Sequence, residues 1–252
     1  MKLQDEVALL GFERLQSSAR PGRVRGSQLR LEPASFESVL TSSLREQVRR
    51  IIRGRIIAGD IVPGAIYSIP QFAALLGVSA TPVREAVLDL GNQDLVEVVR
   101  NRGFRVPDLS ERDIDEVVQL RLMLEVPAVI AIAKDPPTHQ LADLRRMTGA
   151  ITASAQAGDL VGFVENDRDF HLALLSCFGN QRLVAVVGRL RDQSRLYRGL
   201  ADTGPLMDFT REHDELLDAV ERADRGAAEK VITRHLKHAR DIWAGRQEDG
   251  KI

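Results

Sequence analysis

Apolar residues in the first third of the chain recur at the three- and four-residue spacing of an amphipathic helix. The positions that carry this pattern are Leu40, Leu44, Val48, Ile51, Ile52 and Ile56. They predict a first helix that begins near Phe36 and ends near Ala58–Gly59. The following residues, DIVPGAIYS, predict a turn and a short extended segment.

Two further helices and a tight turn are expected next. The first covers residues 70–76, and Gly77 ends it because glycine adopts the left-handed conformation at little cost. The second covers residues 82–92. Thr81 suits the N-cap, and Pro82 suits the first helical position, where no backbone donor is needed.

The stretch LVEVVRNRGFRV, residues 95–106, contains two β-rich runs around Asn101-Arg102-Gly103, which predicts a β-hairpin. A helix, a helix, a turn, a helix and a hairpin within residues 36–107 are the order of a winged helix-turn-helix. Residues 1–35 precede it as a Pro-, Gly- and Arg-rich extension that we expect to be flexible and basic.

Residues 108–252 contain only helical patterns. The expected helices cover 110–134, 138–157, 159–178, 180–200, 206–224 and 226–246. Short connections between helices favour an antiparallel arrangement. The chain is therefore predicted to be mainly α, with a winged helix of three helices and a hairpin wing followed by an antiparallel bundle of six to seven helices.

Composition is that of an ordinary globular protein, with 44% hydrophobic and 28% charged residues in 252. The net charge of -1 conceals an asymmetry: residues 41–107 hold nine Lys/Arg against six Asp/Glu, and residues 108–252 hold 20 against 25. A polyanionic partner is thus expected at the front half only. No apolar run is long enough to span a membrane, and the lone Cys177 fits a reducing cytoplasm.

The stretch GVSATPVREAV suits the second motif helix of a helix-turn-helix, whose first residues enter the major groove. Ser79, Ala80 and Thr81 are small enough for close approach, and free backbone N–H groups there attract phosphate. Arg84, one turn further, has the donors to bind guanine O6 and N7 together. At the hairpin tip, Arg102 and Gly103 would meet the sugar-phosphate backbone.

Histidines and one aspartate suggest a metal site in the back half. Asp167 and His171 share one helix face, and His213 and His235 lie in two other predicted helices. These four side chains can converge in a bundle core and suit Zn, Ni, Mn or Fe(II). The same set would also serve a metal-dependent hydrolase or oxygenase, while a plain Asp–His helix pair is the simplest alternative. His139 and His238 are expected at the surface.

The segments PGAIYSIPQFAALLGVSATPVREAV and LVEVVRNRGFRV resemble the GntR family of bacterial transcription regulators over residues 41–107. The resemblance implies DNA contacts by Thr81, Arg84, Arg102 and Gly103. The chain departs from the family pattern at Ala80, where arginine is common, and at Pro70, where a polar or basic residue is common.

Residues 109–244 resemble the FCD ligand-sensing domain of FadR-type regulators, on the segments LRLMLEV, NDRDFH, GN, EH and HL. In metal-binding members the ligands are an Asp and three His, which transfer to Asp167, His171, His213 and His235. Arg121 matches an arginine that faces the same cavity, although an i,i+4 bridge to Glu125 explains it equally well. Arg195 is a second, weaker effector-binding candidate.

Together the resemblances imply a transcriptional regulator, expected to be a repressor. It would bind a palindromic double-stranded DNA operator as a homodimer, because a two-fold protein matches a two-fold site. It would sense a small organic acid in a bundle that holds a divalent metal ion, with Zn first and Ni, Mn or Fe compatible. The alternatives are a metal-dependent enzyme and a metal-free regulator that senses an acyl effector.

The arginine-rich segment of the extension, ARPGRVRGSQLR, is a candidate minor-groove arm. Removal of residues 1–35 is expected to weaken DNA binding and to flatten its dependence on salt, because fewer phosphate charges would be neutralised. Titration of a labelled duplex at several salt concentrations measures both effects. Unchanged affinity in the truncated protein would contradict the idea.

Overall fold

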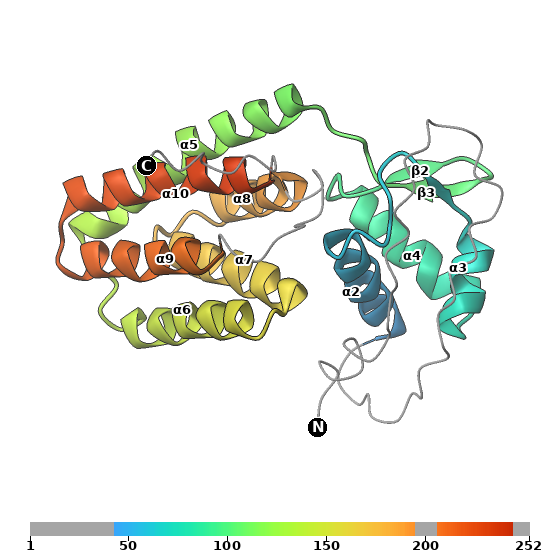
Figure 1. Ribbon diagram of the computed structural model, residues 1–252, viewed down its shortest axis with the longest axis horizontal. Helices are drawn as coiled ribbons and strands as arrows, with labels where there is room; N and C mark the ends of the chain where they lie inside the picture. Colours follow the sequence, from blue (N-terminus) through green and yellow to red (C-terminus); the bar gives the residue numbers. More distant parts are fainter. Residues whose placement is uncertain (1–42, 195–205, 244–252) are drawn as a thin grey trace, which may run out of the picture.

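A computed structural model describes residues 43–194 and 206–243 (Figure 1). The winged helix comprises α2 (Leu44–Ile57), β1 (Ile66–Tyr67), α3 (Ile69–Leu76), α4 (Ala80–Gly91), β2 (Glu97–Val99) and β3 (Gly103–Arg105). The bundle comprises α5 (Glu111–Lys134), α6 (Leu141–Gln156), α7 (Leu160–Ser176), α8 (Gln181–Ser194), α9 (Leu206–Glu221) and α10 (Arg225–Trp243). The predicted fold class is confirmed. The basic extension, residues 1–35, lies outside the described residues.

Local signals in the sequence account for the helix-turn-helix. Gly77 follows α3 with φ 65°, the left-handed conformation expected of it. The start of α4 was predicted wrongly, because Ser79 rather than Thr81 is the N-cap. Pro82 is therefore the third residue of the helix. It is tolerated there because backbone N–H groups of the first turn have no intrahelical partner.

The hairpin expected over residues 95–106 forms, and β1 extends it to a three-stranded antiparallel sheet with the order β1-β3-β2. Phe104 pairs with Tyr67 on one side and with Val98 on the other. The ring of Phe104 is fully buried and lies 5.7 Å from the ring of Tyr67 and 5.7 Å from that of Phe72. This aromatic contact ties the sheet to α3.

The bundle begins at a capping box. The Ser110 hydroxyl accepts the backbone N–H of Asp113, and the Asp113 carboxylate accepts the backbone N–H of Ser110. α5 then packs against α8 and α10, while α6 packs against α7 and α9. The helix expected from residue 138 begins at Leu141 instead, because residues 136–140 form a turn with bonds from Thr138 and Gln140 back to two proline carbonyls.

Each part of the molecule has its own apolar core. The two cores meet at α2, the helix of the winged helix that packs against α7 (Figure 1). Ile57 of α2 belongs to the core of the bundle. Gly54, one turn earlier, also faces α7, where an added Cβ would make an ordinary contact of 3.5 Å with a methyl group of Val161. In the described part of the chain, no helix combines the length and the apolar character that crossing a membrane requires.

Gly103 is buried in the sheet with φ 131°, and a Cβ at this position would lie 1.9 Å from the carbonyl oxygen of Tyr67. We expect Gly103→Ala to lower the free energy of unfolding by about 1–3 kcal/mol or more, because β1 must move away from β3. Denaturant titration followed by circular dichroism measures the loss.

Gly59→Ala is the matched control, since Gly59 also has a positive φ of 77° but nothing within 4 Å of an added Cβ. It carries the backbone strain without the clash. Equal losses in the two variants would contradict the proposed contact between β3 and β1.

Candidate metal centre and nucleic-acid interface

Asp167, His171, His213 and His235 are buried together in the centre of the bundle, and we refer to them as the Asp/His cluster. Asp167 and His171 lie one turn apart on α7, His213 comes from α9 and His235 from α10. One ligand atom from each residue lies within 4.8 Å of the others. The structure thus brings together all four residues that the sequence suggested as metal ligands.

Hydrogen bonds outside the cluster fix the orientation of two imidazoles. Nδ1 of His213 lies 3.2 Å from the carbonyl oxygen of Thr210, and Nδ1 of His235 lies 3.0 Å from Oε2 of Glu212. A carbonyl and a carboxylate only accept, so each Nδ1 carries a proton. In both rings Nε2 therefore points into the cluster.

Two close contacts inside the cluster bring ligand atoms together. Nε2 of His213 lies 2.9 Å from Oδ1 of Asp167, and Nε2 of His235 lies 2.9 Å from Nε2 of His171. Burial lowers the pKa of His171, and burial together with the neighbouring His213 lowers that of His235 to about 4. His171 and His235 are therefore neutral at pH 7, as metal ligation requires.

Glu212 supports the cluster from outside. Burial acts to raise the pKa of Glu212, but hydrogen bonds from His235 and His238 outweigh it and hold that pKa well below its usual range. A carboxylate that accepts from the far nitrogen of a ligating histidine orients the ring and raises its basicity. His238 was expected at the surface; it is half-buried instead, because its Nδ1 lies 3.3 Å from Oε1 of Glu212. His139 is exposed as expected.

A chain of buried charges adjoins the cluster, and we call it the arginine–carboxylate chain: Arg121, Glu125 and Arg191. Arg121 Nε donates to Glu125 Oε1 at 2.8 Å, and Arg191 Nη2 donates to Oε2 at 2.5 Å. Arg191 Nη1 also lies 3.4 Å from Oδ2 of Asp167. The i,i+4 bridge considered for Arg121 is therefore present, and Glu125 joins it to the cluster.

Electrostatics keeps Glu125 and Arg191 charged at neutral pH. Burial would raise the pKa of Glu125, but the two guanidiniums together outweigh it and lower that pKa. Burial lowers the pKa of Arg191 to about 10, which leaves the side chain protonated at pH 7. Within the described part of the chain, Nε of Arg191 is buried without a hydrogen-bond partner.

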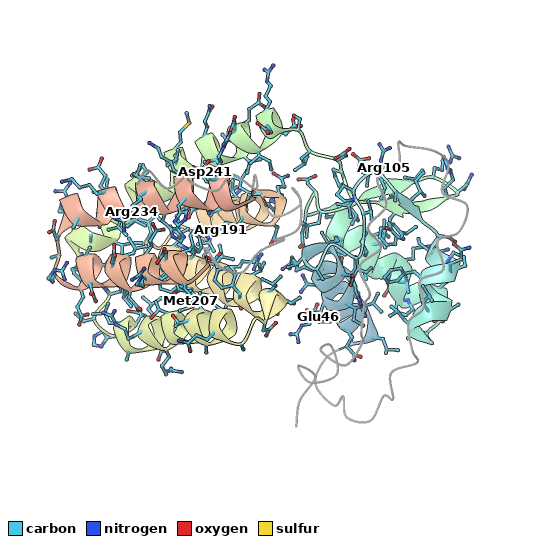
Figure 2. The ribbon with its side chains drawn as sticks, viewed as in Figure 1. Glu46, Arg105, Arg191, Met207, Arg234 and Asp241 are labelled. Atoms are coloured by element: carbon cyan, nitrogen blue, oxygen red, sulfur yellow. The ribbon has the colours of Figure 1, made fainter. Side chains whose placement is uncertain are left out.

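Arg191 is a site residue that the sequence analysis missed. It lies on the buried face of α8 between Val187 and Ser194, and Figure 2 shows it among the side chains inside the bundle. The sequence signal that could have identified Arg191 is its helical spacing, which places it on the buried face of α8. Arg195, the effector candidate chosen from the sequence, is the next residue after α8 and lies outside the described residues.

The start of α4 presents the residues expected to meet DNA. Ser79, Thr81 and Arg84 are exposed, and Ala80 is half-buried. Among the described residues Arg84 has no hydrogen-bond or ion-pair partner, whereas Arg45, at the start of α2, is paired with Asp89. An exposed guanidinium that is free of protein partners is available to an external one.

The wing places Arg102 at its exposed tip, and Arg100 beside it is also exposed, a basic residue that the sequence analysis did not single out. Neither arginine has a partner among the residues that the structure describes. Arg105 on β3, labelled in Figure 2, is by contrast paired with Glu97 across the hairpin. Gly103 is buried against β1, which by itself accounts for a glycine at this position.

Two family models of known proteins match separate parts of the chain. Residues 44–106 match the family model of bacterial regulatory proteins of the gntR family, and residues 116–238 match that of the FCD domain. A GntR transcriptional regulator from Rhodococcus sp. RHA1 has a similar solved structure, with a TM-score of 0.66 and 28% identity. The match covers 82% of this chain and 100% of that one.

Two relatives are named as repressors. The "Probable D-xylose utilization operon transcriptional repressor" of Paenarthrobacter nicotinovorans is 30% identical over 204 residues, covering 81% of this chain and 90% of that protein. The HTH-type transcriptional repressor RspR of Escherichia coli (strain K12) is 26% identical over 217 residues, covering 83% and 93%. These relatives are regulators and not enzymes. The chain therefore belongs to the GntR family of bacterial transcriptional regulators, among those that carry an FCD domain.

Proposed function

We propose that this regulator is a cytoplasmic repressor that binds a palindromic operator as a homodimer and releases it in response to a small organic acid. The acid would enter the bundle at a divalent metal ion held by the Asp/His cluster. The repressor assignment follows the names of two relatives. The DNA contacts would be made by the first turn of α4, by Arg84 and by Arg102 at the wing.

The observation that carries the metal proposal is the convergence of four buried ligand atoms within 4.8 Å of one another. Nδ1 of His213 faces the carbonyl oxygen of Thr210, so its Nε2 points into the cluster and lies 2.9 Å from a carboxylate oxygen of Asp167. An imidazole nitrogen and a carboxylate oxygen that converge in this way can ligate one metal ion together. His235 likewise directs Nε2 at His171. One divalent ion would contact all four groups.

Three imidazoles and one carboxylate suit Zn first, and they also accept Ni, Mn or Fe(II). When bound, such an ion acts as a Lewis acid toward an oxygen of the ligand. Arg191 would orient Asp167 by holding Oδ2, which leaves Oδ1 directed into the cluster. Glu212 and the carbonyl of Thr210 would hold the imidazoles in the ligating tautomer.

Charge balance supports an anionic effector. The charges of Arg121 and Arg191 are matched by those of Glu125 and Asp167, so a divalent ion adds positive charge that nothing in this group neutralises. A carboxylate would supply the missing negative charge. Nε of Arg191, which has no hydrogen-bond partner among the described residues, is a candidate donor to it. This polar interior disfavours the metal-free acyl alternative, since an alkyl chain would leave these groups unsatisfied.

Metal content tests the proposal most directly. Purified, untagged protein is expected to carry about one ion per chain, measured by mass spectrometry, and His213→Ala and His235→Ala are expected to lose it because each removes one of four ligands. His139→Ala, an exposed histidine away from the cluster, is the control and should retain the ion. A wild type that stays empty after incubation with Zn, Mn and Ni would refute the metal site.

DNA readout can be tested on duplexes selected from a random pool by the wild type. Arg84→Ala is expected to weaken binding to the selected site by about 1–3 kcal/mol and to relax the preference at one base pair. Arg102→Ala is expected to weaken binding to all sequences and to reduce the salt slope by about 1. Arg45→Ala, whose guanidinium is paired with Asp89, is the control. Wild-type affinity and specificity in Arg84→Ala would exclude α4 as the reading helix.

A further inference from the structure

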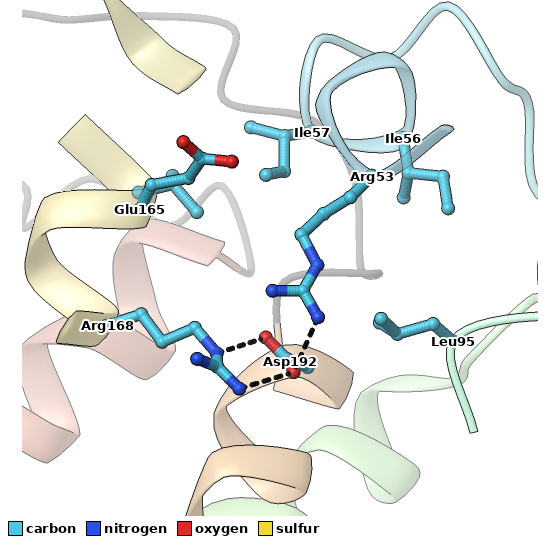
Figure 3. Close-up of a pocket in the computed structure, with 8 residues that line it drawn as sticks. Arg53, Ile56, Ile57, Leu95, Glu165, Arg168 and Asp192 are labelled. Carbon is cyan, nitrogen blue, oxygen red and sulfur yellow. Dashed lines mark hydrogen bonds and ion pairs between the residues drawn. The ribbon is translucent and has the colours of Figure 1, made fainter. Parts of the chain in front are cut away.

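Three charged side chains join the winged helix to the bundle, and we call them the junction cluster: Arg53, Arg168 and Asp192 (Figure 3). Arg53 on α2 donates Nη2 to Oδ2 of Asp192 at 3.2 Å. Arg168 on α7 donates Nε to Oδ1 at 2.8 Å and Nη2 to Oδ2 at 3.2 Å. The carboxylate on α8 is thus held from both parts of the molecule.

The junction cluster also reaches the end of α4. Nη2 of Arg53 donates to Oε1 of Gln93 at 2.8 Å, and Gln93 lies two residues beyond the last residue of that helix. Two hydrogen bonds through one guanidinium therefore connect α8 of the bundle to the end of α4. The cavity at this junction is about 20 Å³, room for a water molecule and too small for an effector.

Sequence register relates this cluster to the candidate metal centre. Arg168 follows the ligand Asp167 on α7, and Asp192 follows Arg191 on α8. Consecutive residues thus form two ion pairs of opposite polarity between the same two helices. The pair between Asp167 and Arg191 faces the Asp/His cluster, and the pair between Arg168 and Asp192 faces α2.

Burial makes both pairs sensitive to small displacements. The side chain of Asp192 is 3% exposed, that of Arg53 14% and that of Arg168 23%. A buried carboxylate that loses a partner carries a large desolvation cost, so its partners move with it. Consecutive residues of a helix move together. A shift of α8 that changes the contact between Arg191 and Asp167 therefore also moves Asp192 relative to Arg53.

We propose that Arg53 and Asp192 couple the Asp/His cluster to the winged helix, so that a bound metal ion and the seating of α2 on the bundle favour each other. The inference rests on the proposed metal site and adds the route by which that site reaches the DNA-binding part. Arg53 is a positioning residue here, since it acts through Asp192 and Gln93, which belong neither to the Asp/His cluster nor to the face of α4 expected to meet DNA. By reciprocity, loosening α2 must weaken metal binding.

The affinity of the full-length protein for Zn²⁺, measured by competition with a chromophoric chelator, tests this coupling. Arg53→Met keeps the aliphatic stem and removes the charge, and Asp192→Asn removes the carboxylate; both are compared with their double variant. Arg45→Met is the matched control, because Arg45 lies on the same helix but pairs with Asp89 inside the winged helix. Circular dichroism and thermal melting show which variants are folded.

We expect Arg53→Met to raise the Kd for Zn²⁺ by about fivefold to tenfold, within the usual range of coupling between sites. The double variant should be no weaker than Asp192→Asn alone, because both changes break one interaction. Arg53→Lys should retain part of the affinity, and Arg45→Met all of it. An Asp192→Asn protein that does not fold leaves the comparison of Arg53→Met with Arg45→Met decisive.

Hydrogen exchange of residues 44–57 gives a readout that a purely local role would not move. Zn²⁺ is expected to slow exchange there in the wild type and in Arg45→Met, but not in Arg53→Met. Equal Kd values in Arg53→Met and Arg45→Met, with equal protection by Zn²⁺, would overturn the coupling and leave the metal site intact. A wild type that binds no ion would overturn both.

Discussion

Several ionised groups lie at the centre of the bundle, and none of them can be buried alone. Removing an ion from water costs several kcal/mol even after relaxation, so each charge requires an opposite one in contact. Glu125 receives two guanidiniums, from Arg121 on its own helix and from Arg191 on α8. Arg191 in turn contacts Asp167 on α7. This requirement of pairing sets the register of α5, α7 and α8, and with it the position of the one carboxylate in the Asp/His cluster.

The histidines depend on the same principle expressed as hydrogen bonds. The carbonyl of Thr210, three residues earlier on the same helix, orients the ring of His213. The carboxylate of Glu212, on the neighbouring helix, orients the ring of His235. These hydrogen bonds direct Nε2 of both rings into the Asp/His cluster. Asp167 contacts both sets of groups, because Oδ2 faces the guanidinium of Arg191 and Oδ1 faces the imidazole of His213.

Sequence patterns predicted most of the helices, because 3.6-residue periodicity and Gly or Pro breaks are local. They also suggested the Asp/His cluster, since Asp167 and His171 share a face. These local patterns could not predict contacts between residues that are far apart in the sequence. Arg191 is 66 residues from Glu125, and Arg53 is 139 from Asp192. β1 has two residues, too few for any periodicity, and exists only because it pairs with β3. Gly103 was assigned to an approach to DNA, whereas its nearest neighbour is the backbone of β1.

Ile57 shows that the border between the two parts in sequence is not their border in space. It belongs to α2 of the winged helix, yet its side chain is part of the core of the bundle, and Gly54 beside it faces Val161 of α7. A winged helix cut from the chain after residue 107 would carry this apolar side chain into water, and the bundle left behind would have a hole. Exchange of whole segments between family members, by recombination or by design, therefore has to carry α2 and the facing surface of α7 as one matched unit.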